Sequence, residues 1–219
     1  MARRKQESLD INDTGSSAGE VTDAQLLQRH LQGDSAAFGA LIERYRQELY
    51  AFLARFVGDR HLAEDVFQEA FLQLHISAGS FDLTKRLKPW LFTIAANKAR
   101  DALRKRSRRQ MAPLDASVGG GDEDAASYGD LMPADIPAPQ ESLMNLELRQ
   151  SVENIVRQMP DHLRIVLVLA YFSELPYKEI AEIVEAPLGT VKSRLHAAVK
   201  MFAEKWQGAA KRLGYEHES

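Results

Sequence analysis

The chain has 219 residues, of which 45% are hydrophobic and 27% charged, and its formal net charge is −3. This length fits one domain or two small ones, and the lack of cysteine excludes disulfides and thiolate metal sites. The longest apolar run, IVLVLAYF at 165–172, is too short to span a bilayer, and the N-terminal stretch lacks the apolar core of a secretory signal. We therefore expect a cytoplasmic protein in which any affinity for nucleic acid comes from local patches of charge.

Two helix signals follow a polar tail, residues 1–21, that we expect to be disordered. Asp23 is expected to cap a short helix that stops at Gly33, and Asp34 a long helix that ends at Gly58. Apolar residues recur along the long helix at spacings of three and four, at Phe38, Leu41, Ile42, Tyr45 and Leu49. This spacing predicts a helix with one buried face.

A third helix is expected from about Arg60 to Ile76. Its core-facing positions are Ala63, Phe67, Ala70 and Leu74. Another side carries Asp65, Gln68, Glu69 and Leu72, and such a mostly polar side is usually a solvated surface. His61, Asp65 and Glu69 have the spacing of ligands on one helix face, but no further ligand supports them, so we predict no metal site.

A fourth helix is expected to begin at Pro89 and to include a basic block, residues 97–109, with seven Lys or Arg and one acid. One stripe of this helix carries Trp90, Thr93, Asn97, Arg100, Arg104 and Arg108, while Leu91, Ile94 and Ala95 point away from it. Arginines hold phosphates and an aromatic ring can stack on an unpaired base, so the stripe suits nucleic acid. A solvated helix end with Trp90 in the core explains this stretch alone equally well.

The composition changes at residues 110–140, which hold three consecutive glycines, four prolines, six acids and no base. Such a segment buries too little apolar surface to fold, which predicts a flexible acidic linker. Helical patterns then continue to about Gly208, with breaks near Pro160, Pro176 and Pro187, before a C-terminal tail at 209–219. The expected fold class is all-α, with two small helical domains at 22–109 and 141–208.

A helix-turn-helix pattern occupies residues 177–200. Ile180, Ala181 and Val184 form the buried face of its first helix, and EAPLG makes the turn. The second helix starts at Thr190 and has an apolar stripe at Val191, Leu195, Ala198 and Phe202. Its opposite side carries Lys192, Ser193, His196 and Lys200, where such a helix meets base edges and phosphates in the major groove. Helical proteins that bind no DNA also produce this pattern.

Three motifs, taken together and in this order, resemble the bacterial RNA polymerase sigma factors of the sigma-70 family, in the two-domain extracytoplasmic-function (ECF) branch. They are AEDVFQEAFLQLH at 63–75, FDLTKRLKPWLFTIAANKARDALRKRSRR at 81–109 and MPDHLRIVLVLAYFSELPYKEIAEIVEAPLGTVKSRL at 159–195. The resemblance covers roughly residues 23–206. It implies a non-enzymatic protein without cofactor that binds core RNA polymerase, recognises the −10 and −35 promoter elements and opens DNA, in a stress or envelope response.

The resemblance also implies roles for individual residues. Core polymerase, through the coiled coil of its largest subunit, would bind Asp65, Gln68, Glu69 and Leu72. The −10 element, with one base flipped into a pocket, would contact Ser77, Phe81, Lys85, Arg86, Lys88, Trp90, Asn97, Arg100, Arg104 and Arg108. The −35 element would contact Thr190, Lys192, Ser193, His196 and Lys200. Other implied partners are the polymerase flap and an anti-sigma factor, and the acidic linker would pass through the RNA-exit path.

Four positions depart from the family pattern. Ala197 and Val199 stand where many relatives carry arginine, Glu185 where glycine is usual, and Thr93 where a basic residue is common. We therefore expect modest −35 affinity, with phosphate contacts shifted to Lys200 and Lys205.

Three other interpretations explain parts of the sequence. A helix-turn-helix regulator that binds operator DNA without polymerase is the main alternative, but it needs a dimer surface and leaves the polar side at 65–72 unexplained. An enzyme is disfavoured because the six histidines are scattered and no glycine-rich phosphate loop is present. A structural adaptor would use the helix faces only for protein contacts. Dependence of DNA binding on core polymerase distinguishes these classes.

Overall fold

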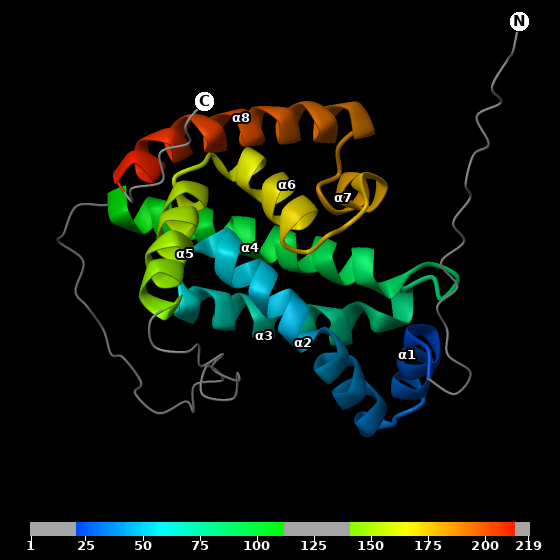
Figure 1. Cartoon of the computed structure of the whole chain (residues 1–219). Helices are drawn as coiled ribbons and strands as arrows, with labels where there is room; N and C mark the ends of the chain where they lie inside the picture. The colour runs from blue at the N-terminus through cyan, green and yellow to red at the C-terminus, as the bar shows by residue number, and fades with distance from the viewer. Residues whose placement is uncertain (1–20, 112–140, 213–219) are drawn as a thin grey trace, which may run out of the picture.

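The computed structural model describes residues 21–111 and 141–212 (Figure 1). Within these ranges the chain forms eight α-helices, one short 3₁₀ helix and no strand, so the expected all-α fold class is confirmed there. In chain order the elements are α1 (Asp23–Leu31), α2 (Ser35–Val57), α3 (Arg60–Ser77), η1 (Ala78–Ser80), α4 (Leu87–Met111), α5 (Glu141–Arg157), α6 (Asp161–Tyr171), α7 (Tyr177–Ile183) and α8 (Leu188–Arg212). None of the helices in the described ranges is long and apolar enough to cross a membrane.

The segments expected to lack structure fall mostly outside the described residues. The tail at 1–21 does so apart from Val21, and the linker at 110–140 apart from Gln110 and Met111, which belong to α4. Of the C-terminal tail expected at 209–219, residues 209–212 belong to α8, which continues to Arg212, and the rest lie outside the described residues.

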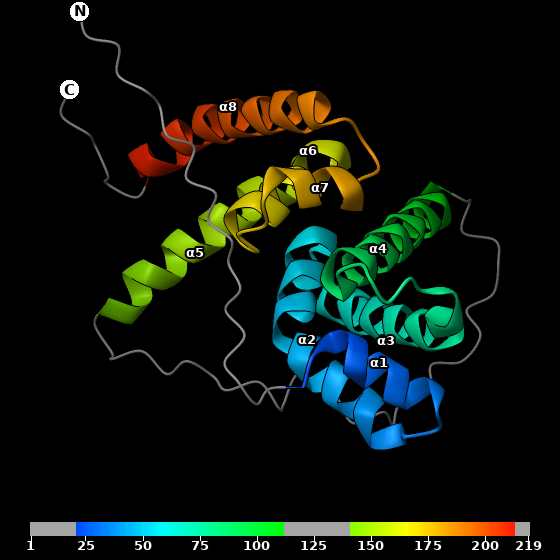
Figure 2. The same cartoon turned by 90° about the vertical axis from the view of Figure 1, so that its right-hand side faces the viewer.

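Helices α1 to α4 form an N-terminal bundle in which α2, α3 and α4 pack together and α1 lies against α2 (Figures 1 and 2). Its centre is aromatic: Phe52 stacks on Phe56 with centroids 5.8 Å apart and lies 5.4 Å from Phe92. The expected core faces are confirmed by the buried residues Leu41, Tyr45, Leu49, Ala63, Ala70, Leu74, Leu91 and Ala95. Phe38, Ile42, Phe67 and Ile94 pack at the edge of this core.

The ends of α2 follow its sequence signals. Asp34 accepts hydrogen bonds from the backbone amides of Ala36 and Ala37 at 3.0 and 3.3 Å, which caps the first turn as expected. Gly58 ends the helix in the left-handed region, with φ of 71°, which glycine adopts without steric cost. These two signals set the length of the helix that carries most of the aromatic core.

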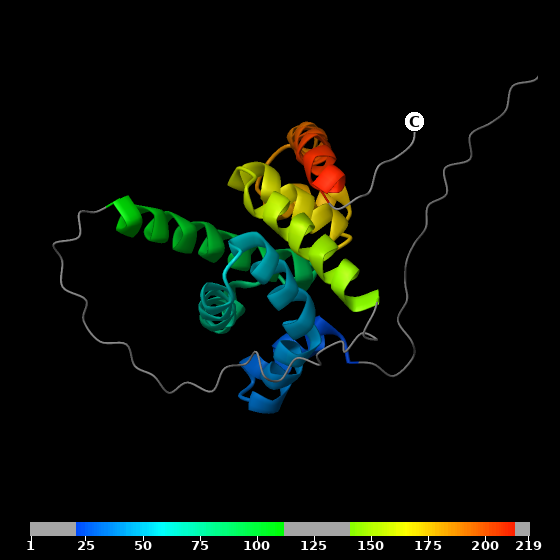
Figure 3. The same ribbon diagram turned by 60° about the vertical axis from the view of Figure 1, so that its left-hand side comes forward.

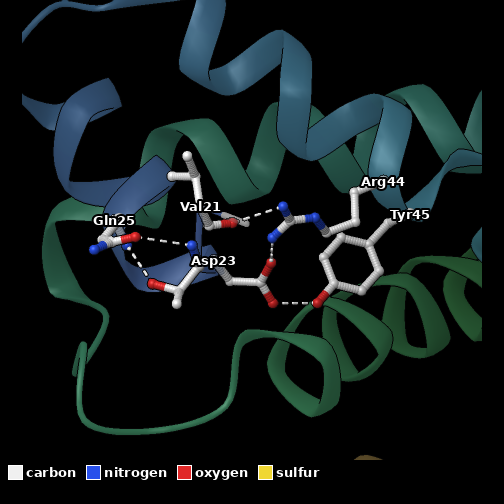
Figure 4. Close-up of polar contacts among 6 residues, drawn as sticks. Val21, Asp23, Gln25, Arg44 and Tyr45 are labelled. Carbon is white, nitrogen blue, oxygen red and sulfur yellow. Dashed lines mark hydrogen bonds and ion pairs between the residues drawn. The ribbon is translucent and has the colours of Figure 1, made fainter. Parts of the chain in front are cut away.

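The start of α1 differs from the expectation that Asp23 caps it. Thr22 is the cap: its hydroxyl accepts from the Gln25 amide at 3.3 Å, and the Gln25 side chain accepts from the Thr22 amide at 2.9 Å (Figure 4). Asp23 points toward α2 instead, where it accepts from Arg44 at 2.5 Å and from the Tyr45 hydroxyl (Figure 4). The carboxylate therefore fastens α1 to the bundle.

Helix α4 begins at Leu87, before the expected start at Pro89. A proline is tolerated within the first turn because amides there have no acceptor inside the helix. Three small buried residues, Ala95, Ala96 and Ala99, allow α3 to pack closely against α4. Side chains on the other side of α4 are thereby directed away from α3.

Helices α5 to α8 form the C-terminal bundle, in which α6 and α7 pack against α8. The buried faces expected for the helix-turn-helix are confirmed at Ile180, Val184, Val191, Leu195 and Ala198, with Ala181 and Phe202 at the edge. The second helix of this motif, α8, begins at Leu188 rather than Thr190. In the turn, Glu185 has a φ of 51°, the left-handed conformation for which glycine is the usual residue.

The two bundles pack directly against each other. Helix α7 lies over α4, and α5 and α6 lie beside α2 (Figures 1 and 3). Arg164 of α6 stands over the Phe56 ring at 5.3 Å, and Arg55 of α2 stands over the Phe172 ring at 5.0 Å. The C-terminal end of α4 projects away from these contacts (Figures 2 and 3).

Candidate nucleic-acid interface

The side of α3 expected to bind a protein partner is accessible. Asp65, Gln68, Glu69 and Leu72 are all exposed, and Leu72 retains 59% of its surface. Among the described residues, Glu69 forms only a long ion pair, with its carboxylate 3.7 Å from the Lys98 amine of α4. Ile76, which is 68% exposed, extends the same side by one turn and was missed in the sequence, although its spacing of four from Leu72 could have revealed it.

A groove of about 670 Å³ between α3 and α4 borders this side. Its charged walls are balanced, with Asp59, Asp65, Glu69 and Asp101 against Lys98, Lys105, Arg106 and Arg109. Two of these acids are paired across the groove, Glu69 with Lys98 and Asp59 with Arg106 at 3.0 Å. Within the described ranges no group of three or more His, Cys, Asp or Glu side chains could hold a metal ion, the His61–Asp65–Glu69 spacing included.

The basic stripe of α4 changes in exposure along its length. Arg104 and Arg108 are exposed near the projecting end of the helix, whereas Trp90, Thr93, Asn97 and Arg100 are half-buried. Arg100 donates to the Asn97 side-chain oxygen at 3.0 Å, so these two residues are held together. Burial lowers the pKa of the Arg100 guanidinium; Glu185 opposes this shift, and Arg104 and Arg194 add to it.

Two aromatic residues meet where a flipped base is expected to bind. The rings of Phe81 and Trp90 stack with centroids 4.5 Å apart and an interplanar angle of 22°. Trp90 also packs at the edge of the core, as the alternative interpretation expects, and its contact with a base stays a prediction. Ser77, expected to line the same pocket, donates to the Gln73 carbonyl at 2.5 Å. The paired rings provide an aromatic surface of the kind on which unpaired bases stack.

The loop before α4 is held by its own hydrogen bonds. Asp82 accepts from the Thr84 amide at 3.0 Å and from its hydroxyl at 2.7 Å, and these bonds lower the pKa of the Asp82 carboxyl. Lys85 is exposed, and Arg86 pairs with Glu179 of α7. The Lys88 amine lies 2.6 Å from a carboxylate oxygen of Glu48 of α2, so its side chain points toward α2.

The base-facing side expected for α8 is exposed. Lys192, Ser193, His196 and Lys200 are all accessible, and Thr190 is half-buried at the start of the helix. Ser193 donates to the Thr190 carbonyl at 3.0 Å. Arg194, which was not among the predicted contact residues, is half-buried, and its charge acts on Arg100 of α4. Neighbouring Ala197 and Val199 are exposed and offer no charge for phosphates.

Both helical bundles match families of known proteins. The family model of Sigma-70 region 2 matches residues 41–109, and that of Sigma-70, region 4, matches residues 149–202. The ECF RNA polymerase sigma factor SigW of Bacillus subtilis is 36% identical over 165 residues, which are 75% of this chain and 86% of that protein. The RNA polymerase sigma-H factor of Pseudomonas aeruginosa is 36% identical over 80% of this chain and 89% of its own length.

Solved structures show the same fold. CnrH in complex with the cytosolic domain of CnrY covers 85% of this chain and 97% of its own, with a TM-score of 0.61 and 21% identity. The sigma factor RpoE from Bartonella quintana, in complex with the anti-sigma factor NepR, covers 78% of this chain and 96% of its own, with a TM-score of 0.59 and 22% identity. At these identities the likeness is one of fold.

Proposed function

Since the chain belongs to the ECF branch of the sigma-70 family of bacterial RNA polymerase sigma factors, we propose which of its surfaces perform the sigma function. A sigma factor binds core RNA polymerase and promoter DNA and thereby starts transcription. The single observation that supports the assignment best is the match of both family regions, in order, in a chain 36% identical to SigW over 86% of that protein. An operator-binding regulator without polymerase is not favoured.

Residues 22–109 form the domain that docks on core polymerase and opens the −10 element, in this proposal, and residues 141–208 the domain that reads the −35 element. The docking surface is the exposed side of α3 formed by Asp65, Gln68, Glu69 and Leu72, to which we add Ile76. Exposed apolar side chains beside carboxylates suit a protein partner better than DNA, whose phosphates the acids would repel.

The −10 element is bound by α4 and the loop before it. The Phe81–Trp90 pair supplies the aromatic surface on which an unpaired base stacks, and Ser77 and Asn97 supply polar groups at the edge of that surface. The arginines of the α4 stripe contact the phosphates. Lys85 and Arg86 lie on the loop side of this surface. Lys88 can contact DNA only if its ion pair with Glu48 breaks. Taking a base out of its stack costs a few kcal/mol, which these contacts must offset.

The −35 element is bound by α8 through Thr190, Lys192, Ser193, His196 and Lys200. The uncharged Ala197 and Val199 make this contact weak in isolation, so promoter affinity depends on both domains acting together on one DNA. We further infer that the protein acts in the cytoplasm, has no catalytic activity or cofactor of its own, contacts the polymerase flap and is held by an anti-sigma factor. We also infer that it acts in a stress or envelope response.

The test is binding of the fluorescently labelled full chain to purified bacterial core RNA polymerase without DNA. Submicromolar binding that Gln68→Ala weakens by about tenfold supports the docking assignment. Gln47→Ala, an exposed glutamine on α2, is the matched control and is expected to bind like the original chain. Equal binding by all three proteins removes the α3 assignment, and no binding by any of them removes the proposed function.

A further inference from the structure

Ser107 lies near the C-terminal end of α4, which projects away from the contacts between the bundles (Figures 2 and 3). Its side chain is exposed, and its hydroxyl forms no hydrogen bond with any described residue. Ser77 and Ser193, by contrast, donate to backbone carbonyls of their own helices. None of the proposed contacts uses the Ser107 hydroxyl, which is therefore accessible to a modifying enzyme.

Positive charge surrounds this serine in the sequence and on the surface. The three residues before it, 104–106, and the two after it, 108–109, are all Lys or Arg, and all are exposed. No other Ser or Thr of the chain has more than two Lys or Arg within three positions. A serine kinase whose substrate groove is lined by carboxylates selects such a segment by charge complementarity.

The segment that carries Ser107 is held to the rest of the molecule by few contacts. All side chains of residues 104–109 are exposed, and the last fully buried residue before them is Ala99. Among the described residues this segment forms one ion pair with another helix, between Arg106 and Asp59 at 3.0 Å, and that pair lies at the surface. Exposed ion pairs and unpacked helical turns contribute little stability, so this end can unfold locally. It can therefore take the extended form in which a kinase binds its substrate.

We propose that Ser107 is a phosphorylation site for an arginine-directed serine kinase, and that its phosphate captures Arg104 and so weakens binding of the −10 element without affecting polymerase docking. This inference rests on the proposed roles of α3 and α4. In the reaction the Ser107 hydroxyl oxygen attacks the γ-phosphorus of ATP and forms a new P–O bond. The bond from that phosphorus to the β-phosphate oxygen breaks and ADP leaves, while a base of the kinase takes the hydroxyl proton.

The phosphate acts on the basic stripe of α4. Ser107 stands three positions after Arg104, a spacing that places the two side chains next to each other on the helix. The Arg104 side chain is 70% exposed and its guanidinium is 3.5 Å from its present partner, Asp101, so it is free to turn to another anion. A phosphoserine carries a charge of about −1.5 to −2 at pH 7 and three acceptor oxygens. It therefore binds this arginine in place of a DNA phosphate.

The docking surface on α3 faces away from this phosphate. Lys105 and Arg109 line the groove that borders the docking surface. On a helix of 3.6 residues per turn, Ser107 is about 160° away from both of them, on the opposite side of α4. Phosphorylation therefore gives a sigma factor that still occupies polymerase but binds the −10 element weakly.

The first experiment asks whether the folded chain is a substrate. The full chain is incubated with radiolabelled ATP and the catalytic subunit of cyclic-AMP-dependent protein kinase, an arginine-directed enzyme used as the probe. Label is expected on Ser107, where peptide mass spectrometry locates it, and is expected to be lost in Ser107→Ala. Ser35→Ala removes an exposed serine without a nearby base and should be labelled like the original chain. Labelling that persists undiminished in Ser107→Ala would overturn the site assignment.

The second experiment measures the consequence of the phosphate. The full chain phosphorylated on Ser107, made by the kinase or by incorporation of phosphoserine at that codon, is bound to purified core polymerase. Its affinity for core is expected to equal that of the unmodified chain. The affinity of the holoenzyme for a promoter that it transcribes in vitro is expected to fall by about tenfold. The plot of log affinity against log salt should become shallower by about 1, as for the loss of one phosphate contact.

Two variants separate capture of Arg104 from a general effect of the modification. In Arg104→Ala the phosphate is expected to lower promoter affinity much less, because the group through which it acts is already missing. Ser107→Asn, which is polar but uncharged, should bind the promoter like the original chain. Promoter affinity that phosphorylation leaves unchanged, an equal loss in the Arg104→Ala chain, or a loss of core affinity overturns the inference. Failure of the unmodified chain to bind polymerase would instead contradict the proposed function.

Discussion

The Tyr45 hydroxyl of α2 donates a hydrogen bond to Asp23 in the first turn of α1, and Arg44 binds the other oxygen of the same carboxylate (Figure 4). Burial and the bond to Asp23 raise the pKa of Tyr45, so the phenol remains a donor at any physiological pH. This contact joins a short helix to the bundle that carries the proposed docking surface.

Tyr45→Phe is therefore expected to destabilise the chain by about 1 to 3 kcal/mol, because it leaves a partly buried carboxylate with one partner fewer. Urea denaturation followed by circular dichroism measures the change. Tyr50→Phe is the matched control, since the buried hydroxyl of Tyr50 has no acceptor among the described residues and its loss should cost nothing. Equal stability of the two variants would show that the Asp23 contact contributes nothing.

The pH dependence of stability is expected to reflect a histidine pair. His30 of α1 and His75 of α3 share a hydrogen bond of 2.9 Å, and burial, followed by the charge of His75, lowers the pKa of His30 from 6.5. The folded state thus binds fewer protons than the unfolded chain, so stability is full above about pH 6.5, falls as the pH drops below that value and levels off once the pH is below the lowered pKa.

This sign is checked by urea denaturation at a series of pH values from about 7.5 down to about 5.5. His75→Gln keeps a hydrogen-bonding group but removes the charge that helps to lower the pKa of His30, so its loss of stability on acidification should be smaller. His61→Gln, an exposed histidine on α3, should leave the pH profile as it is. A stability that rises on acidification would refute the assignment.

The turn of the helix-turn-helix offers a third test. Glu185 stands in the left-handed region, so Glu185→Gly is expected to stabilise the C-terminal bundle by about 1 kcal/mol through relief of backbone strain. Glu185→Gln removes the charge but keeps the strain, and should not stabilise the bundle. Thermal unfolding measures both. A melting temperature that rises equally in the two variants would assign the effect to charge instead.

Local signals predicted the helices better than the contacts between them. Asp34, Gly58 and the apolar spacings act within one turn, so the ends and buried faces of α2 were correct. The partner of Asp23, by contrast, lies 22 positions away on another helix, and no local pattern identifies it. The same holds for Lys88, whose position suggests a DNA contact but which turns to Glu48.

The exposed part of the candidate site could be predicted from the sequence. The contacts that the C-terminal bundle makes with it could not. Asp65, Gln68, Glu69 and Leu72 form one accessible surface, as the spacing on α3 indicated. The pairing of Arg86 with Glu179 joins two segments expected to form separate domains on a flexible tether, and no local pattern links residues so far apart in the chain. The sequence indicated that Glu185 is unusual only because glycine is the common residue at this turn position.

The exposed apolar side of α3 gives a fourth prediction. Ile76 is exposed one turn beyond Leu72, so Ile76→Ala should leave folding unchanged while weakening the affinity for core polymerase by about tenfold, as truncation of an interface side chain does. Titration of labelled chain with core polymerase measures it. Val199→Ala on α8, also apolar and exposed, is the control and should bind normally. Normal binding by Ile76→Ala would show that Ile76 does not belong to the docking surface.

The last prediction concerns opening of the −10 element. Asn97 accepts from Arg100 and lies on the half-buried part of the α4 stripe, so Asn97→Ala removes the polar edge of the proposed base pocket and frees the arginine to move. Core binding should be unaffected, because the proposed docking surface lies on α3. Permanganate reactivity of unpaired thymines, on a promoter that the holoenzyme transcribes in vitro, should fall by about tenfold, since the flipped base loses part of the binding that offsets its unstacking. Ser107→Ala, at an exposed position of the same helix, should give the original footprint. An unaltered footprint with Asn97→Ala would place the pocket elsewhere, and a loss of core binding would mean that the substitution disturbs the bundle rather than the DNA contact.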